Sequence, residues 1–118
     1  MKAAKKFSDV FQQMLAERAH QIAKHGDKDH PDGVNPNLIP ALMQIQELVG
    51  VRQEIGAVSW VEILAEEFLE VATEPDPVKL KAELVQVATV CAAWIHWLER
   101  RDKHRFNKKN ACGNGVVE

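Results

Sequence analysis

Cysteine is scarce in this sequence, and only Cys91 and Cys112 occur among its 118 residues. Two cysteines do not provide the disulfide framework of a small secreted domain, so a reducing compartment is the simplest interpretation. The basic residues 1–6 are not followed by an apolar segment, so no signal peptide is expected. The most apolar stretch, residues 84–98, is interrupted by polar side chains and is too short to span a bilayer. We therefore expect a cytoplasmic protein without a membrane partner.

The chain also lacks a strong net charge and any strand pattern. A formal net charge of −2 gives no overall field that would favour a nucleic acid polymer or a membrane surface. No segment shows the alternation of a β-strand, and no internal repeat is evident. Hydrophobic residues make up 46% and charged residues 27%, which fits a single globular domain with an apolar core.

Apolar residues recur at helical spacing along the first half of the chain. The pattern predicts a helix from about Ser8 to His25, where Gly26 provides a natural stop. Residues 26–37 are rich in turn formers and predict a long loop. Residues 38–56 again have a helical apolar stripe, and a break near Gly50 stays open.

The second half has clearer helix boundaries. Ser59 and Glu62, three residues apart, form a capping-box signature at the start of a helix. After a proline-containing turn, a last helix is expected from about Pro77 to Arg101. That helix is apolar nearly all round, which indicates burial on more than one side and hence a partner subunit. The polar residues 102–118 are expected to form a flexible tail.

Together these patterns predict an all-α domain over residues 1–101. It would be a bundle of three to four helices, completed by oligomerisation as a homodimer or homotetramer.

The most informative pattern is a set of acids in the middle of the chain. Glu66, Glu67 and Glu70 fall within about a quarter-turn on one helix, and Glu83 and Gln86 share a face of the next. Carboxylate oxygens are the ligands that Mg²⁺ prefers. If the two helices are antiparallel neighbours, Glu83 would close a cation site from the side opposite the first three. A solvated acidic helix face gives the same spacing, so both interpretations stay open at this point.

The acidic pattern resembles a known family. Glu66-Glu67-x-x-Glu70 followed by Glu83-x-x-Gln86 is similar to the EExxE…ExxD signature of the MazG-like, all-α nucleoside triphosphate pyrophosphohydrolase superfamily. Other stretches look like a bacterial and phage branch of that superfamily, and the likeness covers most of residues 8–100: Glu17-Arg18-x-x-Gln21-x-x-Lys24-x-Gly26, His30-Pro31-Asp32-Gly33, Ser59-Trp60 and Glu83-Leu84-Val85-Gln86-Val87-Ala88.

The resemblance implies a MazG-like helical bundle and a chemistry. Such enzymes use Mg²⁺, with Mn²⁺ as a possible substitute, to cleave the α–β phosphate bond of a nucleoside triphosphate, giving the monophosphate and pyrophosphate. Glu66, Glu67, Glu70 and Glu83 match the catalytic, metal-binding positions of the motif. No protein nucleophile is required, which agrees with the lack of a convincing Ser-His-Asp or Cys-His arrangement.

Gln86 departs from the motif, because the superfamily usually has Asp at this position. An amide can offer its carbonyl oxygen to a cation but brings no charge, so Gln86 is an uncertain metal ligand. This departure supports an alternative, a non-catalytic MazG-like helical module that binds a nucleotide or a protein partner.

The resemblance also suggests substrate contacts on the first helix. Gln21 would contact a base edge, and Arg18 or Lys24 would contact phosphate. Without the resemblance, these residues are better explained as an exposed helix face. Trp60, at a helix start, is a fourth candidate because its ring could stack on a base.

Overall fold

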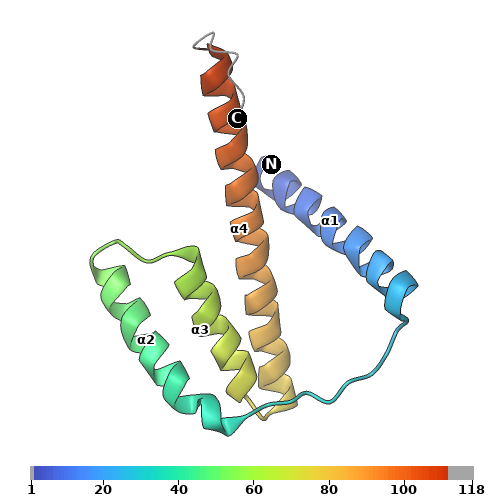
Figure 1. Cartoon of the computed structure of the whole chain (residues 1–118), viewed down its shortest axis with the longest axis vertical. Coiled ribbons are helices and arrows are strands. Elements are labelled where there is room, and N and C mark those ends of the chain that lie inside the picture. Colours follow the sequence, from blue (N-terminus) through green and yellow to red (C-terminus); the bar gives the residue numbers. More distant parts are fainter. Residues whose placement is uncertain (1, 112–118) are drawn as a thin grey trace.

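The computed structural model describes residues 2–111, and it describes side chains for residues 7–102. This part of the chain is all-α and contains no strand, as the sequence predicts (Figure 1). Its elements, in order, are α1 (Lys2–His25), the short 3-10 helix η1 (Pro36–Leu38), α2 (Ile39–Glu54), α3 (Trp60–Thr73) and α4 (Pro77–Ala111). None of the described helices combines the length and the apolar character needed to cross a membrane.

Helix α1 begins at Lys2, six residues before the predicted start at Ser8. Lysine and alanine in this stretch are strong helix formers, which the apolar pattern does not register. The predicted stop is confirmed. Gly26 has a φ of 79° and its backbone N–H donates to the carbonyl oxygen of Ile22 at 2.8 Å. Only glycine adopts this left-handed conformation without strain, so the helix ends there.

Helix α2 passes through Gly50 without a break. Its C-terminus is closed by a Schellman motif, in which the N–H of Ala57 donates to the carbonyl of Arg52 at 2.8 Å. The N–H of Gly56 donates to the carbonyl of Gln53 at 3.1 Å, and Gly56 has the positive φ of 67° that this motif requires. The Schellman motif at Gly56 therefore ends the helix, whereas Gly50 is tolerated inside it.

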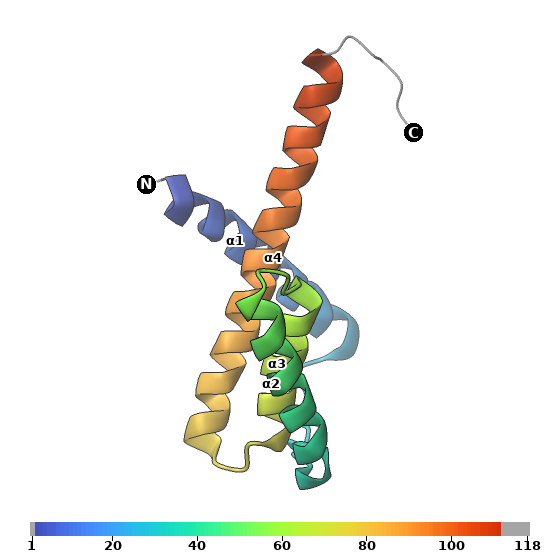
Figure 2. The same ribbon diagram turned by 90° about the vertical axis from the view of Figure 1, so that its left-hand side faces the viewer.

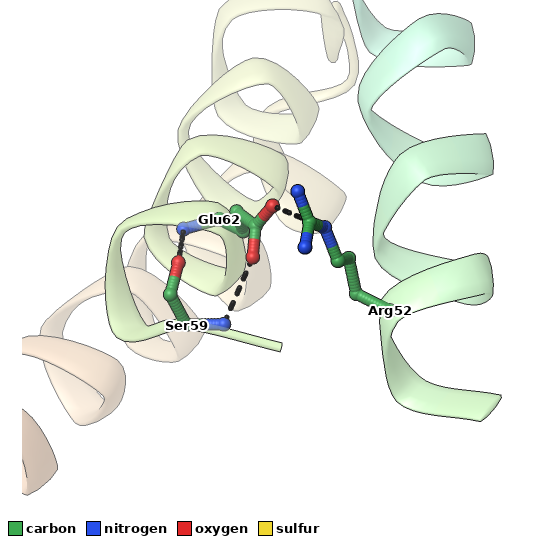
Figure 3. Close-up of polar contacts among 3 residues, drawn as sticks. All are labelled: Arg52, Ser59 and Glu62. Atoms are coloured by element: carbon green, nitrogen blue, oxygen red, sulfur yellow. Dashed lines mark hydrogen bonds and ion pairs between the residues drawn. The ribbon is translucent and has the colours of Figure 1, made fainter. Parts of the chain in front are cut away.

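The capping box at the start of α3 is confirmed (Figure 3). Ser59 Oγ accepts from the backbone N–H of Glu62 at 3.1 Å, and Glu62 Oε1 accepts from the N–H of Ser59 at 2.9 Å. The second carboxylate oxygen of Glu62 lies 3.4 Å from Nε of Arg52 on α2. One side chain thus caps α3 and connects it to α2.

A short turn through Pro75 joins α3 to α4. Asp76 caps α4, since its Oδ2 accepts from the backbone N–H of Lys79 at 3.3 Å. Helix α4 continues to Ala111, so the predicted end at Arg101 is wrong and residues 102–111 belong to the helix. The segment is polar, but it contains good helix formers, and its basic residues favour a helix C-terminus. Residues 112–118, the rest of the predicted tail, lie outside the described residues.

The helices form an open arrangement (Figures 1 and 2). Helix α3 packs between α2 and α4, and α1 packs on α4 alone. The loop after α1 is fixed to α3 where the N–H of Asn35 donates to the carbonyl of Ala72 at 2.8 Å. The radius of gyration is 18.3 Å, compared with about 13 Å for a compact chain of this length. Among the residues with described side chains, only four hydrophobic ones are buried: Val10, Val49, Leu80 and Ala92.

Candidate metal centre

Three of the predicted glutamates meet at the α3–α4 hairpin. Glu67 and Glu70 of α3 and Glu83 of α4 each offer one carboxylate oxygen, and these oxygens all lie within 4.8 Å of one another. We call these three residues the glutamate cluster. All three side chains are half-buried. The antiparallel pairing of α3 and α4 brings together acids that are more than twelve residues apart in sequence.

The stacking of two tryptophans fixes the register of this hairpin. The rings of Trp60 on α3 and Trp94 on α4 lie 6.4 Å apart with 9° between their planes. Glu67 follows Trp60 by seven residues, which is about two helical turns, so both side chains are on the face of α3 that meets α4. Glu83 precedes Trp94 by eleven residues on the antiparallel helix and arrives at the same level as Glu70.

Two carboxylate oxygens of the cluster have no hydrogen-bond partner among the described residues. Oε2 of Glu67 and Oε2 of Glu83 are buried and accept no hydrogen bond from the described part of the chain. Burial is the main cause that raises the pKa of Glu67, and the neighbouring charge of Glu83 adds to it. Burial also raises the pKa of Glu70, while a hydrogen bond shared with Glu83 lowers it and the charges of Glu67 and Glu66 raise it again. The pKa of Glu83 rises from burial first and then from the shared hydrogen bond with Glu70.

These donors fit a hard divalent cation. Two oxygens on opposite sides of one Mg²⁺ are about 4.2 Å apart, because each Mg–O bond is about 2.1 Å long. The 4.8 Å limit within the glutamate cluster is therefore within reach of small side-chain rotations. A bound cation would also offset the mutual repulsion that adds to burial in raising the three pKa values. Mg²⁺ and Mn²⁺ both match an all-carboxylate donor set.

The other two members of the motif lie at the edge of this group. Glu66 is half-buried and is not part of the cluster, but its negative charge raises the pKa of both Glu67 and Glu70. Gln86 is exposed, three residues after Glu83 on α4. Its role as a ligand stays a prediction.

The predicted substrate contacts on α1 gather around a different hollow. Arg18, Gln21 and Lys24 line a cavity of about 650 Å³ at the C-terminal end of α1, and none of the clustered glutamates lines it. Arg18 forms an exposed ion pair with Asp27, with Nη2 and Oδ1 3.2 Å apart. Within one chain, the structure thus brings the three α1 residues together but does not place them at the glutamate cluster.

The same cavity includes residues that the sequence interpretation did not single out as ligand contacts. His20 and Lys28 contribute to its lining. His20 lies three residues after Glu17 and four before Lys24, so helical spacing alone could have found it.

Trp60 is less open than its position at a helix start suggested. It is half-buried, and its stacking on Trp94 covers part of its ring. It lies about 10 Å along the helix axis from Glu67, given seven residues at 1.5 Å each. A role for Trp60 in substrate binding stays a prediction, and its packing role is observed.

Comparison of the chain with models of known protein families, with curated proteins and with solved structures finds no match. The functional interpretation therefore rests on the residues and their arrangement.

Proposed function

We propose that this chain is a Mg²⁺-dependent nucleotide pyrophosphohydrolase, which cleaves the α–β phosphate bond of a nucleoside or deoxynucleoside triphosphate. The observation that supports the proposal is the glutamate cluster, since three motif acids from two helices offer oxygens within 4.8 Å of one another. An exposed acidic helix face, the competing interpretation of the sequence, does not require half-buried carboxylates with raised pKa values.

In this proposal the side chains bind and position, and they form no covalent bond with the substrate. Mg²⁺, when bound, supplies neutralisation of phosphate charge and lowers the pKa of the attacking water. Glu67, Glu70 and Glu83 would hold it through ionised carboxylates, and the α3–α4 packing keeps their oxygens close together. Water would attack phosphorus while the α–β bridging bond breaks, which gives a nucleoside monophosphate and pyrophosphate.

The nucleotide itself would be held by other residues. Arg18, Gln21 and Lys24 offer two cations and an amide around one cavity, which suits a phosphate-bearing ligand. That cavity is separate from the glutamate cluster within one chain. We therefore further propose that the protein acts as a homodimer or homotetramer, in which the cavity of one subunit would lie beside the glutamate cluster of another.

The exposed amide of Gln86 favours a second candidate, a non-catalytic module that binds a nucleotide or a protein partner. With an amide in place of the usual acid, the metal site has less negative charge. Cation binding would then be too weak for turnover, while the fold and the nucleotide cavity would be retained.

Release of pyrophosphate from a panel of canonical and modified triphosphates, with Mg²⁺ or Mn²⁺, tests the first candidate. The proposal expects turnover by the wild type and its loss in Glu70→Ala with unchanged helix content. Glu54→Ala is a matched control, because Glu54 is an exposed helical glutamate on α2. Full activity in Glu70→Ala would disprove the mechanism. Calorimetric binding of a non-hydrolysable triphosphate without any pyrophosphate release from the panel would favour the module.

A further inference from the structure

The cavity at the C-terminal end of α1 is lined by polar and ionisable side chains. Its volume is about 650 Å³, and its lining includes no aliphatic, phenyl or indole group among the residues with described side chains. Six of the lining residues are bases or histidines: Arg18, His20, Lys24, His25, Lys28 and His30. Pockets for small organic molecules are lined mainly by hydrophobic and aromatic groups, so this cavity suits a hydrophilic ligand with negative charge.

Acidic side chains are mostly kept out of this cavity. Glu17 is the only acid that lines it in the described part of the chain. The loop after α1 contains three aspartates, Asp27, Asp29 and Asp32, and none of them is part of the lining. Asp27 pairs with Arg18, with Oδ1 and Nη2 3.2 Å apart. A guanidinium group has five N–H donors, so this ion pair does not prevent Arg18 from binding a second anion.

The permanent cations of the cavity are spread along the end of α1. Arg18 and Lys24 are six residues apart, which is about 9 Å along the helix axis. Lys28 continues the row from the loop, because its Cε lies 3.9 Å from the place that a Cβ on Gly26 would occupy. Cations in a last helical turn also stabilise the helix dipole, but Arg18 lies about two turns before the end and Lys28 lies beyond it. A chain of linked phosphate groups can contact all three cations, whereas a single phosphate is too small for this.

Three histidines, His20, His25 and His30, give the cavity a charge that changes with pH. Histidine is the side chain that ordinarily gains its positive charge between pH 8 and pH 5. The charged groups that line the cavity beside them are one acid and three bases: Glu17, Arg18, Lys24 and Lys28. A bound polyanion favours the protonated form of a nearby histidine, so by reciprocity protonation of the histidines tightens the binding of the polyanion.

We propose that this cavity binds a chain of condensed phosphate groups, either inorganic polyphosphate or the phosphates of a nucleotide, and binds it more tightly as the pH falls from 8 to 6. We call it the polyphosphate cavity. The base of a nucleotide adds little to binding there, and the amide of Gln21 contacts phosphate and not a base edge. The assignment to a nucleotide rests on the proposed function, whereas the binding of inorganic polyphosphate does not require catalysis.

Calorimetric titration of the full chain with inorganic tripolyphosphate, in EDTA at pH 6 and pH 8, tests the proposal. The wild type should bind several-fold more tightly at pH 6. Lys28→Gln should weaken binding several-fold at both pH values, and Lys81→Gln is the control, because Lys81 is an exposed lysine of α4 that does not line the cavity. A triple variant, with Gln in place of the three histidines, should lose most of the pH effect. The part that remains measures the protonation of tripolyphosphate itself.

Three results would overturn this assignment. They are the absence of tripolyphosphate binding at both pH values, an equal loss in Lys28→Gln and Lys81→Gln, and a pH effect that the triple variant keeps in full.

Nucleotide ligands separate the two sources of a phosphate chain. Non-hydrolysable adenine and cytosine triphosphates should bind about as tightly as tripolyphosphate, and adenosine should not bind. Much tighter binding of either nucleotide would show that its base is held as well, contrary to the proposal. Pyrophosphate release is scored separately. Tripolyphosphate binding without any release would contradict the proposed enzyme and support the polyphosphate cavity, whereas release without tripolyphosphate binding would do the reverse.

Discussion

Trp60 and Trp94 stack with their rings 6.4 Å apart and 9° from parallel, and this contact aligns α3 with α4. The alignment has a chemical consequence two helical turns away. It brings Glu83 next to Glu67 and Glu70, which repel one another when ionised. Apolar packing in one half of the hairpin therefore offsets electrostatic repulsion in the other half.

Removing this packing should weaken the fold. We expect Trp94→Ala to lower the free energy of unfolding by about 2–4 kcal/mol, slightly less than a fully buried tryptophan because Trp94 is half-buried. Urea unfolding followed by circular dichroism measures the change. Trp97→Ala is the control, since Trp97 is exposed and its ring contacts only the guanidinium of Arg100 among the described aromatic and cation–π contacts. An equal loss in both variants would show that the stack has no special role in aligning the hairpin.

Much of this fold follows from local sequence signals. The capping pair Ser59 and Glu62, the stop at Gly26 and the start at Pro77 depend on residues within a few positions, and all three are confirmed. The end of α4 was predicted ten residues early, because the apolar periodicity ceases where polar helix formers continue the helix. The contact of Trp60 with Trp94 depends on how two helices pack, which no local signal encodes.

Mg²⁺ should stabilise the protein through the glutamate cluster. A ligand that binds only the folded state at 100 times its dissociation constant raises the free energy of unfolding by about 2.7 kcal/mol. We expect such a rise for the wild type and its loss in Glu70→Gln, which keeps the side-chain shape and removes one charge. Thermal unfolding with Mg²⁺ and with EDTA measures the difference.

Two control variants distinguish Mg²⁺ binding at the glutamate cluster from non-specific screening of acidic side chains. Glu54→Gln removes an exposed glutamate of α2 and should leave the Mg²⁺ effect unchanged. Glu66→Gln should weaken it less than Glu70→Gln does, because Glu66 acts on the cluster only through its charge. Equal responses in all three variants would indicate non-specific screening of an acidic surface.

The stability of the metal-free protein should depend on pH through the same residues. A carboxyl with a raised pKa in the fold binds its proton more tightly there than in the unfolded chain. Protonation of Glu67, Glu70 and Glu83 therefore stabilises the fold below the ordinary pKa of 4.5. This contribution is lost as the pH rises through their raised values.

Thermal unfolding in EDTA, from pH 4 to about pH 7.5, checks this dependence. The wild type should lose stability relative to Glu70→Gln as the pH rises, because the variant has one charge fewer in the cluster. Other carboxyls contribute equally to the pH dependence of both proteins, so their contributions cancel in the comparison. Glu62 is one of them, and its hydrogen bonds with Ser59 lower its pKa. A difference that stays constant over this pH range would contradict the assignment.

The sequence predicted which glutamates meet between α3 and α4, but it did not predict where the other candidate residues would lie. Helical spacing indicated that Glu67, Glu70 and Glu83 share facing sides, and the hairpin brings them together. Spacing could not show that Glu66 would lie outside the group, because this depends on the rotation of α3 against α4. It also could not show that Arg18 and Lys24 line a separate cavity, since the path of the loop after α1 decides that.

Substitution of Gln86 tests most directly whether the glutamate cluster has too little negative charge to bind Mg²⁺ tightly. Gln86→Asp places a carboxylate, on a side chain one methylene shorter, one turn from Glu83, so we expect Mg²⁺ to bind several-fold more tightly. Pyrophosphate release should increase in the same variant if weak metal binding limits turnover. Isothermal calorimetry and the release assay measure the two effects separately, and Gln86→Asn controls for the shorter side chain. Unchanged Mg²⁺ affinity in Gln86→Asp would show that position 86 lies beyond the reach of the ion.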